Sequence, residues 1–388
     1  MSASSSAIRE SAAPVVDLVA GARPNFMKLA PVVRALSDMG TVGFRIVHTG
    51  QHYDASMNDI FFEELGIPKP EVHLEVGSGR HGAQTARILE RYESHLLGAR
   101  PRATVVFGDV NSTMACGLAA VKLGVPVVHV EAGLRSFDPT MPEEVNRKVT
   151  DAIADLLLAT ERTAVDNLVR EGVPEDRIRL VGNVMIDTLL WHLPAARGRN
   201  TAGRLGLEAA YGVVTLHRPQ NVDDPATLAG LLDLLAELAG RIPLVFPVHP
   251  RTLDVARRAN LGDRLTRDAR RLLCVEPLSY LDTLSLLAGA SIALTDSGGL
   301  QEETSVLRVP CLTLRNTTER PCTVELGTSR LVGNDPEKIR AAFAEVLGGA
   351  WPKGADIPLW DGKAGPRVAA ALASWLSCPT TLAAPAIA

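Results

Sequence analysis

Short, uninterrupted apolar runs alternate along this 388-residue chain with longer segments of helical periodicity. Runs rich in Val, Ile and Leu, without polar residues at every second position, are typical of parallel strands covered on both faces. The pattern therefore predicts an α/β fold with doubly wound parallel sheets. The expected strands are 15–19, 44–48, 103–107, 126–130, 156–159, 211–216, 243–247, 292–294 and 311–314.

The order of these runs predicts two Rossmann-like domains in tandem that face a cleft. We expect an N-terminal domain over 15–185 and a C-terminal domain over 186–365, with a linker-like stretch at 194–209. Residues 366–378 form an amphipathic final helix that we expect to pack back on the N-terminal domain. Residues 1–14, which lack the apolar stretch of a signal peptide, and residues 379–388 are expected to be disordered tails.

The bulk composition excludes several classes of protein. The chain is 46% hydrophobic and 22% charged, as is usual for a soluble globular protein, and its net charge of −4 gives no sign of a nucleic-acid partner. Its five cysteines are scattered and form no C-x-x-C motif, which argues against a disulfide framework or a metal site. We therefore expect a reducing, cytoplasmic location, and no apolar run is long enough to span a membrane.

The stretch SIALTDSGGLQEE, residues 291–303, has the arrangement of a phosphate-binding turn. A strand leads into Ser297-Gly298-Gly299, and a helix is expected from Leu300. Backbone N–H groups at such a helix start bind anions. Glu302 and Glu303 are expected in the first helical turn, where they either complement the helix dipole or reach back to ribose hydroxyls.

A basic turn, GARPNFMK at 21–28, follows the first strand. It is not the G-x-G-x-x-G dinucleotide fingerprint, so no NAD site is predicted. Pro24 takes a first helical position, with Arg23 before it and Lys28 about one turn later. Two cations oppose the positive end of the helix dipole, and a bound anion would relieve this repulsion, so we favour an anion site over a solvated turn.

Carboxylates follow the strands of the first half. Asp109 comes after the strand at 103–107, and Glu131 ends the strand at 126–130. Burial should raise the pKa of Glu131 and make it a proton carrier, while a salt bridge to Arg135 is the structural alternative. In MPEEVNR, Glu143 is the better candidate to point into the cleft, because Glu144 fits ordinary helix-start chemistry.

Basic side chains follow the strands of the second half. His217 and Arg218 end one strand, and His249 follows the next, which favours contact with anionic oxygens. Arg320 is placed to close on a substrate held at the glycine turn, with an ion pair to Glu319 as the alternative. In the first half Gln51 and Gln84 are further polar candidates, and His52 is more simply a loop histidine.

Ten ordered motifs across about residues 15–375 resemble the non-hydrolysing UDP-N-acetylglucosamine 2-epimerases. They are GARPNFMKLAP, TGQHYD, FGDVNST, HVEAGLRS, MPEEVNRKVTD, GNVMIDTL, TLHRPQN, PVHPR, TDSGGLQEE and TTERPCTVELGT. The resemblance implies a glycosyltransferase-B type of fold with UDP in the cleft. It also implies inversion of the sugar at C2 without NAD or metal, in a protein that is often a homodimer. The sequence departs from many members at Ala22 and Asn25, where they carry threonine and glutamate.

The resemblance also implies roles for single residues. Asp109, Glu131 and Glu143 correspond to catalytic carboxylates, and His217 to a histidine near the diphosphate. Positions linked to a regulatory UDP-sugar site in some members are Gln51, Gln84, Arg218 and His249. Contacts to the UDP-sugar correspond to Arg23, Lys28, Ser297, Gly298, Gly299, Glu303 and Arg320.

Three other functions fit parts of the pattern. A glycosyltransferase of the same fold would share the UDP seat but does not explain three carboxylates at strand ends of the first half. A hydrolysing epimerase would release free N-acetylmannosamine and UDP. A non-catalytic nucleotide-sugar sensor would not need the carboxylates at all.

Overall fold

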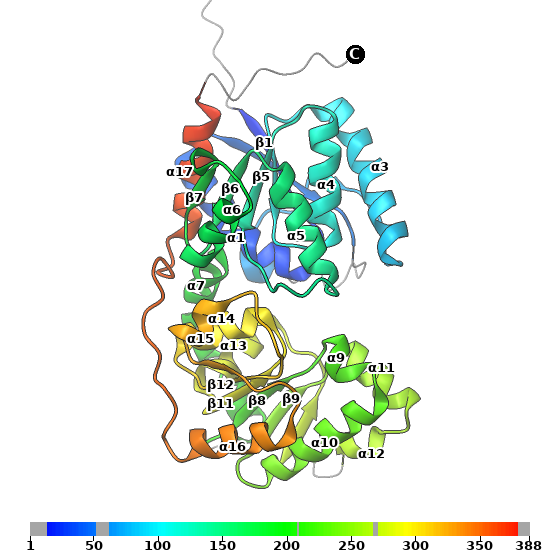
Figure 1. Ribbon diagram of the computed structural model, residues 1–388, viewed down its shortest axis with the longest axis vertical. Coiled ribbons are helices and arrows are strands. Elements are labelled where there is room, and N and C mark those ends of the chain that lie inside the picture. The colour runs from blue at the N-terminus through cyan, green and yellow to red at the C-terminus, as the bar shows by residue number, and fades with distance from the viewer. Residues whose placement is uncertain (1–13, 52–61, 208, 267–270, 379–388) are drawn as a thin grey trace, which may run out of the picture.

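The computed structural model describes residues 14–51, 62–207, 209–266 and 271–378. The two expected tails, apart from Pro14, and His52 lie outside these ranges. The chain forms two α/β domains, each built on one parallel sheet (Figure 1). We call them the first and second domain.

The first domain contains a seven-stranded sheet in the order β3-β2-β1-β4-β5-β6-β7. The order reverses between β1 and β4, which is the point where ligands bind in open α/β sheets, beyond the carboxyl ends of the strands. Its strands are β1 Val15–Ala20, β2 Gly43–His48, β3 Val72–His73, β4 Thr104–Phe107, β5 Val127–Ala132, β6 Leu156–Ala159 and β7 Ile178–Leu180. The helices in this part of the chain are α1 Arg23–Met39, α3 His81–Ala99, α4 Asn111–Lys122, α5 Pro142–Ile153 and α6 Arg162–Arg170.

The second domain repeats this topology in a six-stranded sheet, β10-β9-β8-β11-β12-β13, which reverses between β8 and β11. Its strands are β8 Gly212–Thr215, β9 Leu244–Pro247, β10 Leu272–Val275, β11 Ile292–Thr295, β12 Cys311–Thr313 and β13 Ser329–Leu331. Its helices are α9 Pro219–Val222, α10 Pro225–Ala239, α11 Pro250–Arg258, α12 Gly262–Thr266, α13 Tyr280–Gly289, α14 Gly298–Leu307, α15 Pro321–Glu325 and α16 Pro336–Leu347.

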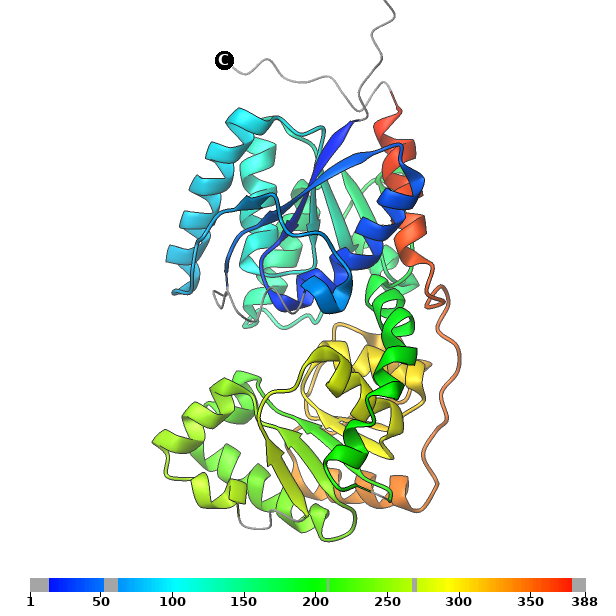
Figure 2. The same ribbon diagram turned by 180° about the vertical axis from the view of Figure 1, so that it is seen from behind.

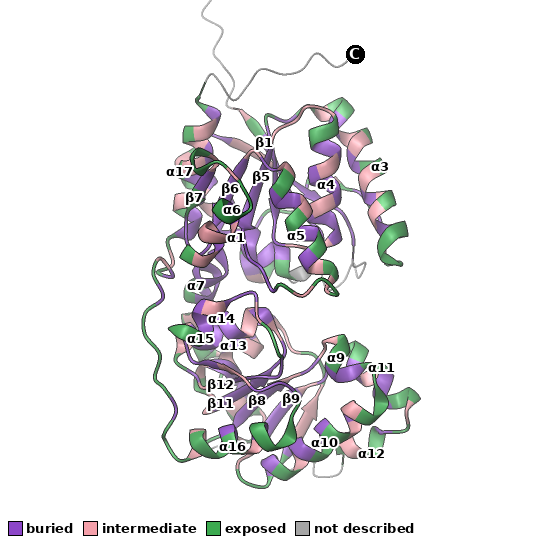
Figure 3. Ribbon diagram, viewed as in Figure 1, coloured by how far each residue is buried: buried purple, intermediate pink, exposed green. Residues whose placement is uncertain are grey.

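Each of the nine expected runs contains a strand, and the predicted parallel α/β fold is confirmed. The four strands that the sequence did not indicate, β3, β7, β10 and β13, are the edge strands of the two sheets. Their residues are largely intermediate or exposed, so they lack a continuous apolar run (Figure 3). Continuous apolar runs in the sequence therefore identify only the inner strands, which are buried on both faces.

The expectation of a linker at 194–209 is wrong. Helix α7 runs over Val184–Gly198 with Pro194 inside it, and α8 follows at Thr201–Arg204. Figure 2 shows α7 passing from one domain to the other. It packs against α1 of the first domain and against α13 and α14 of the second, so the connection is a packed helix.

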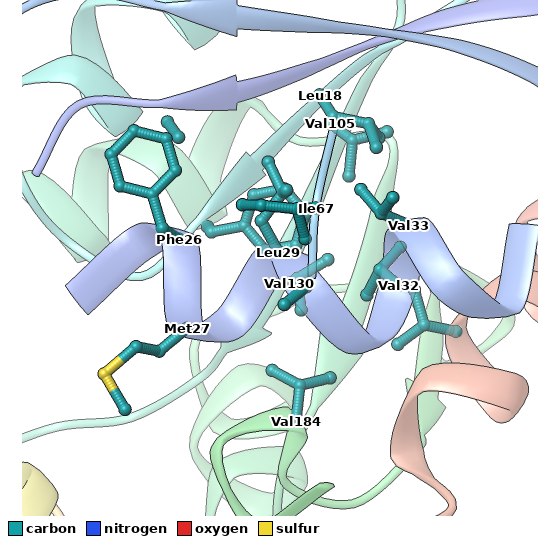
Figure 4. Close-up of a cluster of buried hydrophobic side chains, with 14 of the residues drawn as sticks. Leu18, Phe26, Met27, Leu29, Val32, Val33, Ile67, Val105, Val130 and Val184 are labelled. Carbon is teal, nitrogen blue, oxygen red and sulfur yellow. The ribbon is translucent and has the colours of Figure 1, made fainter. Parts of the chain in front are cut away.

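The last helix, α17, spans Ala364–Leu376 and packs against α1 and α7. Figure 1 shows the chain returning along the side of the molecule to reach this position. Val368 and Leu372 join the core that covers one face of the first sheet, part of which is drawn in Figure 4. The carboxylate of Asp187 in α7 accepts hydrogen bonds from the N–H groups of Ala364 (3.0 Å) and Gly365 (2.7 Å) at the helix start. Within the described ranges, no helix has the length and apolar character needed to cross a bilayer.

Candidate active site

The turn between β1 and α1 is held by Asn25. Its Oδ1 accepts hydrogen bonds from the N–H groups of Gly21 (3.1 Å) and Ala22 (3.0 Å), and its Nδ2 donates to Phe107 O (2.8 Å). Asn25 thus ties the end of β1 to the end of β4. The side chain of Arg23 lies outside the described part of the structure, whereas Lys28 is buried one turn further on.

Glu131 lies at a backbone irregularity at the end of β5. Its φ is +75°, and the pairing of β5 with β6 shifts register between Val130 and Ala132. A non-glycine residue in this region costs about 1–3 kcal/mol, and such strain concentrates at functional sites. The irregularity turns the Glu131 side chain away from the regular alternation of the strand.

Two cations contact the Glu131 carboxylate. Lys28 Nζ lies against Oε2 and Arg320 Nη2 against Oε1, and all three side chains are at most 9% exposed. The alternative of a salt bridge from Glu131 to Arg135 is wrong, because Arg135 pairs with Asp151 (2.7 Å) and Glu171 (2.6 Å). Arg320 comes from the second domain, so Glu131 is held from both sides of the domain interface.

Asp109 lies just after β4 and forms an ion pair with Arg147 of α5. Burial acts to raise the pKa of Asp109, but the charges of Arg147, Lys28 and Arg320 outweigh burial and lower it. The carboxylate therefore stays ionised at neutral pH, and it shares two of its neighbouring cations with Glu131.

The adjacent carboxylates Glu143 and Glu144 have different surroundings, as the sequence indicated. Glu144 is buried and accepts hydrogen bonds from the N–H (2.9 Å) and the Oγ (2.9 Å) of Ser136, and it pairs with Arg147 (2.6 Å). Glu143 faces the second domain, where its Oε1 lies 3.3 Å from Nη1 of Arg218.

Helix α14 begins at Gly298, two residues before the expected Leu300. Glycine is a poor helix former in helix interiors, but at the first positions its cost is small. Glu302 and Glu303 consequently lie beyond the first turn, and the dipole interpretation of them is wrong because that effect fades within one turn. At Gly298 a Cβ would lie 2.6 Å from Glu319 Oε1, so only glycine fits there without a shift.

Ser297 is the N-cap of α14, and its side chain makes no capping hydrogen bond. Its hydroxyl is therefore available to a ligand at the helix N-terminus, next to the first N–H groups of the helix. Figure 1 shows α14 and α15 at the side of the second domain that faces the first.

Glu302 and Glu303 are both buried behind this turn. Burial raises the pKa of Glu302 to about 7, an effect that Arg320 opposes and Glu131 reinforces. Burial raises the pKa of Glu303 to about 8, where the Tyr280 hydroxyl opposes it and Glu302 adds to it. With pKa values in this range, Glu302 and Glu303 change protonation close to neutral pH.

Arg320 is the N-cap residue of α15 and links the two domains. Its Nε contacts Glu302, its Nη2 contacts Glu131, and its Nη1 lies 3.3 Å from Glu319. The expected structural pair with Glu319 thus exists, but it is the longest of the three. Glu319 is held more closely by Arg315 at 2.7 Å.

His217 is oriented by Asp296, which the sequence did not single out. Its Nδ1 lies 3.0 Å from Asp296 Oδ1, and Asp296 also accepts from the N–H groups of His217 (3.0 Å) and Arg218 (2.9 Å). The rings of His217 and His249 lie 5.4 Å apart. The sequence does contain a signal for Asp296, because the residue stands between a strand and a glycine turn. From that position its carboxylate reaches the end of β8, the neighbouring strand of the same sheet.

The remaining candidates divide between the domains. Gln51 Oε1 accepts from Ser112 Oγ (2.8 Å), and Gln84 Nε2 donates to Gln51 O (3.2 Å), so both are fixed beside α4. Arg218 and His249 lie in the second domain, where His249 Nδ1 accepts from Arg251 N (3.2 Å) at the start of α11.

The site thus combines carboxylates at strand ends of the first domain with a helix N-terminus in the second. The Arg320 guanidinium joins them: its Cζ lies 4.0 Å from where a Cβ on Gly298 would be, and its Nη2 contacts Glu131. Such an arrangement can stabilise negative charge on a leaving group at one end and move a proton at the other.

A family model described as UDP-N-acetylglucosamine 2-epimerase matches residues 34–373. A UDP-N-acetylglucosamine 2-epimerase of Methanocaldococcus jannaschii is 41% identical over 361 residues, which cover 91% of this chain and 97% of that protein. A UDP-2,3-diacetamido-2,3-dideoxy-D-glucuronate 2-epimerase of Pseudomonas aeruginosa is also 41% identical, over 333 residues covering 85% and 91%. The crystal structure of a Methanocaldococcus jannaschii UDP-GlcNAc 2-epimerase in complex with UDP-GlcNAc and UDP superposes with a TM-score of 0.86 at 40% identity, covering 93% and 99%.

Proposed function

The chain belongs to the UDP-N-acetylglucosamine 2-epimerase family, and we propose that it interconverts UDP-N-acetylglucosamine and UDP-N-acetylmannosamine without hydrolysis. The observation that carries the proposal is Glu131. It is buried, adopts a left-handed backbone conformation, and lies between a cation of its own domain and one of the other. A structural ion pair does not require this backbone strain.

The proposed reaction begins with loss of UDP from C1. The diphosphate lies over the N-terminus of α14 at Ser297, Gly298 and Gly299, and the helix N–H groups and Arg320 stabilise its developing charge. Glu303, behind this turn, accepts hydrogen bonds from the ribose. His217, oriented by Asp296, lies beside the diphosphate.

Proton transfer at C2 completes the proposed reaction. A first-domain carboxylate, among Asp109, Glu131 and Glu143, removes the C2 proton as UDP departs, which leaves an alkene of the glucal type. A proton returns to the opposite face, and UDP adds again at C1. Lys28 and the three arginines that pair with these carboxylates hold them in place, and closure of the two domains excludes water from the intermediate.

The test is incubation of the purified protein with UDP-N-acetylglucosamine in deuterium oxide, followed by NMR. The proposal expects UDP-N-acetylmannosamine with deuterium at C2, without added acceptor, NAD or metal. Free sugar and UDP as the main products would instead establish a hydrolysing epimerase, and turnover only with an acceptor a transferase.

The identity of the sugar is tested separately. The two relatives described above are named for different UDP-sugars, although their sequence identity to this chain is the same. Parallel assays with UDP-N-acetylglucosamine and UDP-2,3-diacetamido-2,3-dideoxy-D-glucuronate decide between them. We expect the higher kcat/KM for UDP-N-acetylglucosamine.

The proposal extends to assembly, regulation and location. We propose a cytoplasmic homodimer in which Gln51, Gln84, Arg218 and His249 bind a second, activating UDP-sugar. Light scattering at twice the chain mass and a sigmoidal dependence of rate on substrate are the expected results. A monomer with a hyperbolic rate curve would remove this extension and leave the epimerase proposal standing.

A further inference from the structure

Two residues at the start of α15 contact the first domain at neighbouring strands. Arg320 contacts Glu131 at the end of β5. Cys322, two residues on, donates its thiol to Glu161 Oε2 at 2.7 Å, and Glu161 follows β6. Because β5 and β6 are adjacent and parallel, the first turn of α15 is attached to two neighbouring strand ends.

Glu161 is buried and has no direct ion pair in the described part of the chain. It is 4% exposed, its Oε1 accepts from Thr163 Oγ1 at 2.6 Å, and within the described residues no ion pair includes it. Burial raises its pKa, although the hydrogen bonds from Cys322 and Thr163 and the more distant charge of Arg320 act to lower it. A buried carboxyl group without an ionic partner costs free energy, so its presence at this interface calls for another reason.

The thiol of Cys322 can donate its hydrogen bond to Glu161 throughout the neutral pH range. It packs with Ile186 of α7 and with Ile357 and Trp360, residues of the chain segment that returns to α17. Burial and the nearby Glu161 carboxylate raise the thiol pKa, so the proton remains on sulfur throughout the neutral range. The contact therefore lies among the segments that join the two domains.

The position of Arg320 relative to Glu131 depends on how the domains meet. Within the second domain, Arg320 is fixed by Glu302 and Glu319. Its remaining nitrogen reaches Glu131 only if α15 lies in the right register on the first domain. A misplacement of about 1 Å at a reacting centre costs up to about 10²-fold in rate.

We propose that Glu161 and Cys322 are positioning residues that set α15 on the first domain and thereby place the Arg320 guanidinium against Glu131. This inference rests on the proposed epimerase function, because it gives the Arg320–Glu131 contact its purpose. Neither residue touches the substrate in this account.

The experiment compares Cys322→Val, which removes the donor, with Cys322→Ser, which keeps one. Glu161→Leu removes the acceptor, and Cys274→Val, at a partly buried cysteine of β10, is the matched control. We expect kcat to fall at least tenfold in Cys322→Val and Glu161→Leu, with the Kd for UDP within twofold of wild type. Cys322→Ser and the control should keep kcat within about threefold.

Wild-type kcat in Cys322→Val would overturn the inference, and so would a loss in Cys322→Ser as large as in Cys322→Val. A crystal structure of Cys322→Val with UDP gives a readout that is independent of turnover. It should keep Arg320 on Glu302 and separate Arg320 from Glu131, and an unchanged Arg320–Glu131 contact would contradict the inference. Wild-type protein in the same assay tests the proposed function separately, since inactivity there leaves the structural comparison valid.

Discussion

The two domains contain the same histidine–aspartate pair in different settings. In the first domain His129 Nδ1 lies 2.7 Å from Asp151, and in the second His217 Nδ1 lies 3.0 Å from Asp296. Both carboxylates are buried, and both histidines belong to or follow a strand of a central sheet. The two pairs differ in how far the imidazole ring is buried and in what surrounds it.

The ring of His129 is fully enclosed. Its Nε2 lies 2.8 Å from Gly108 O and its Nδ1 lies 2.7 Å from Asp151 Oδ1, so both ring nitrogens already have partners within the first domain. The His217 side chain is 32% exposed at the domain interface. The first ring is committed to holding the loop before Asp109, whereas the second remains available to a ligand.

The comparison shows that a histidine beside an aspartate does not by itself indicate catalysis. His129 and Asp151 act indirectly: the pair supports Gly108, and Asp151 also accepts from Gly133 N at 3.1 Å. These bonds fix the segments on both sides of the Asp109 and Glu131 carboxylates. The enclosed pair thus supports the backbone on which the Asp109 and Glu131 carboxylates are carried.

The largest expected effect is that of His217→Ala on turnover. Loss of a group that acts at the leaving diphosphate should lower kcat by roughly 10²–10⁴-fold. The melting temperature should fall less than in Asp151→Asn, because Asp296 keeps its hydrogen bonds from the N–H groups of residues 217 and 218. Turnover within twofold of wild type would show that His217, like His129, has a structural role, and the proposed difference between the two pairs would be wrong.

The opposite pattern is expected for Asp151→Asn. It leaves Arg135 and the His129 ring without their buried carboxylate, which should lower the free energy of unfolding by about 3–5 kcal/mol. Denaturant unfolding measures this loss. The kcat of the remaining folded protein should fall less than that of His217→Ala, because Asp151 acts only on the backbone beside the carboxylates. Unchanged stability would show that this pair does not support the fold.

A smaller effect is expected from Glu303, on the pH dependence of UDP binding. It tests whether this buried carboxyl group can still bind a ligand. Its pKa of about 8 means that it holds a proton at pH 7. In the proposed complex the ribose hydroxyls donate to the ionised Glu303 carboxylate, so UDP binding should release up to one proton. The affinity for UDP should then rise up to about tenfold per pH unit between pH 6 and 8.

Calorimetry in buffers of different ionisation enthalpy measures the released proton. Glu303→Gln is the matched variant and should bind UDP more weakly, with no proton release. Equal release from the variant would assign the proton to another group.

The smallest expected effect concerns acid stability. Burial acts to raise the pKa of Asp151, but His129 and Arg135 outweigh burial and lower it; in the same way His217 lowers the pKa of Asp296. A lowered carboxyl pKa gives stability that is present above the unfolded value near 4 and is lost as the pH falls through the folded value. Below about pH 4, wild type should lose up to about 1.4 kcal/mol more per pH unit than Asp151→Asn. Parallel slopes would contradict this assignment.

The inner strands and the residues directly after them could be predicted from the sequence. Their burial on both faces leaves a continuous apolar signal, and the chain direction places Asp109 and Glu131 at the same sheet edge. The edge strands left no such signal. Pro194 and the small residues after it are typical of a linker, but packing against both domains stabilises helix α7 there.

Partners that come from distant segments could not be predicted. The bond of Glu161 to Cys322 joins residues 161 positions apart, and Arg320 and Glu131 are 189 positions apart. Neither pair has a local pattern, because only the meeting of the two domains brings the side chains together. Asp296 lay inside a motif that was interpreted through its glycines, and its carboxylate role depends on the neighbouring strand β8.

The most direct test of the account is Glu131→Gln, measured by deuterium exchange at C2 of the UDP-sugar and by UDP binding. The substitution keeps the shape of the side chain and removes its ability to take a proton. We expect the exchange rate to fall by at least about 10²-fold while the Kd for UDP stays within a few-fold of wild type. Exchange at the wild-type rate would remove Glu131 from the chemistry and contradict the site described above.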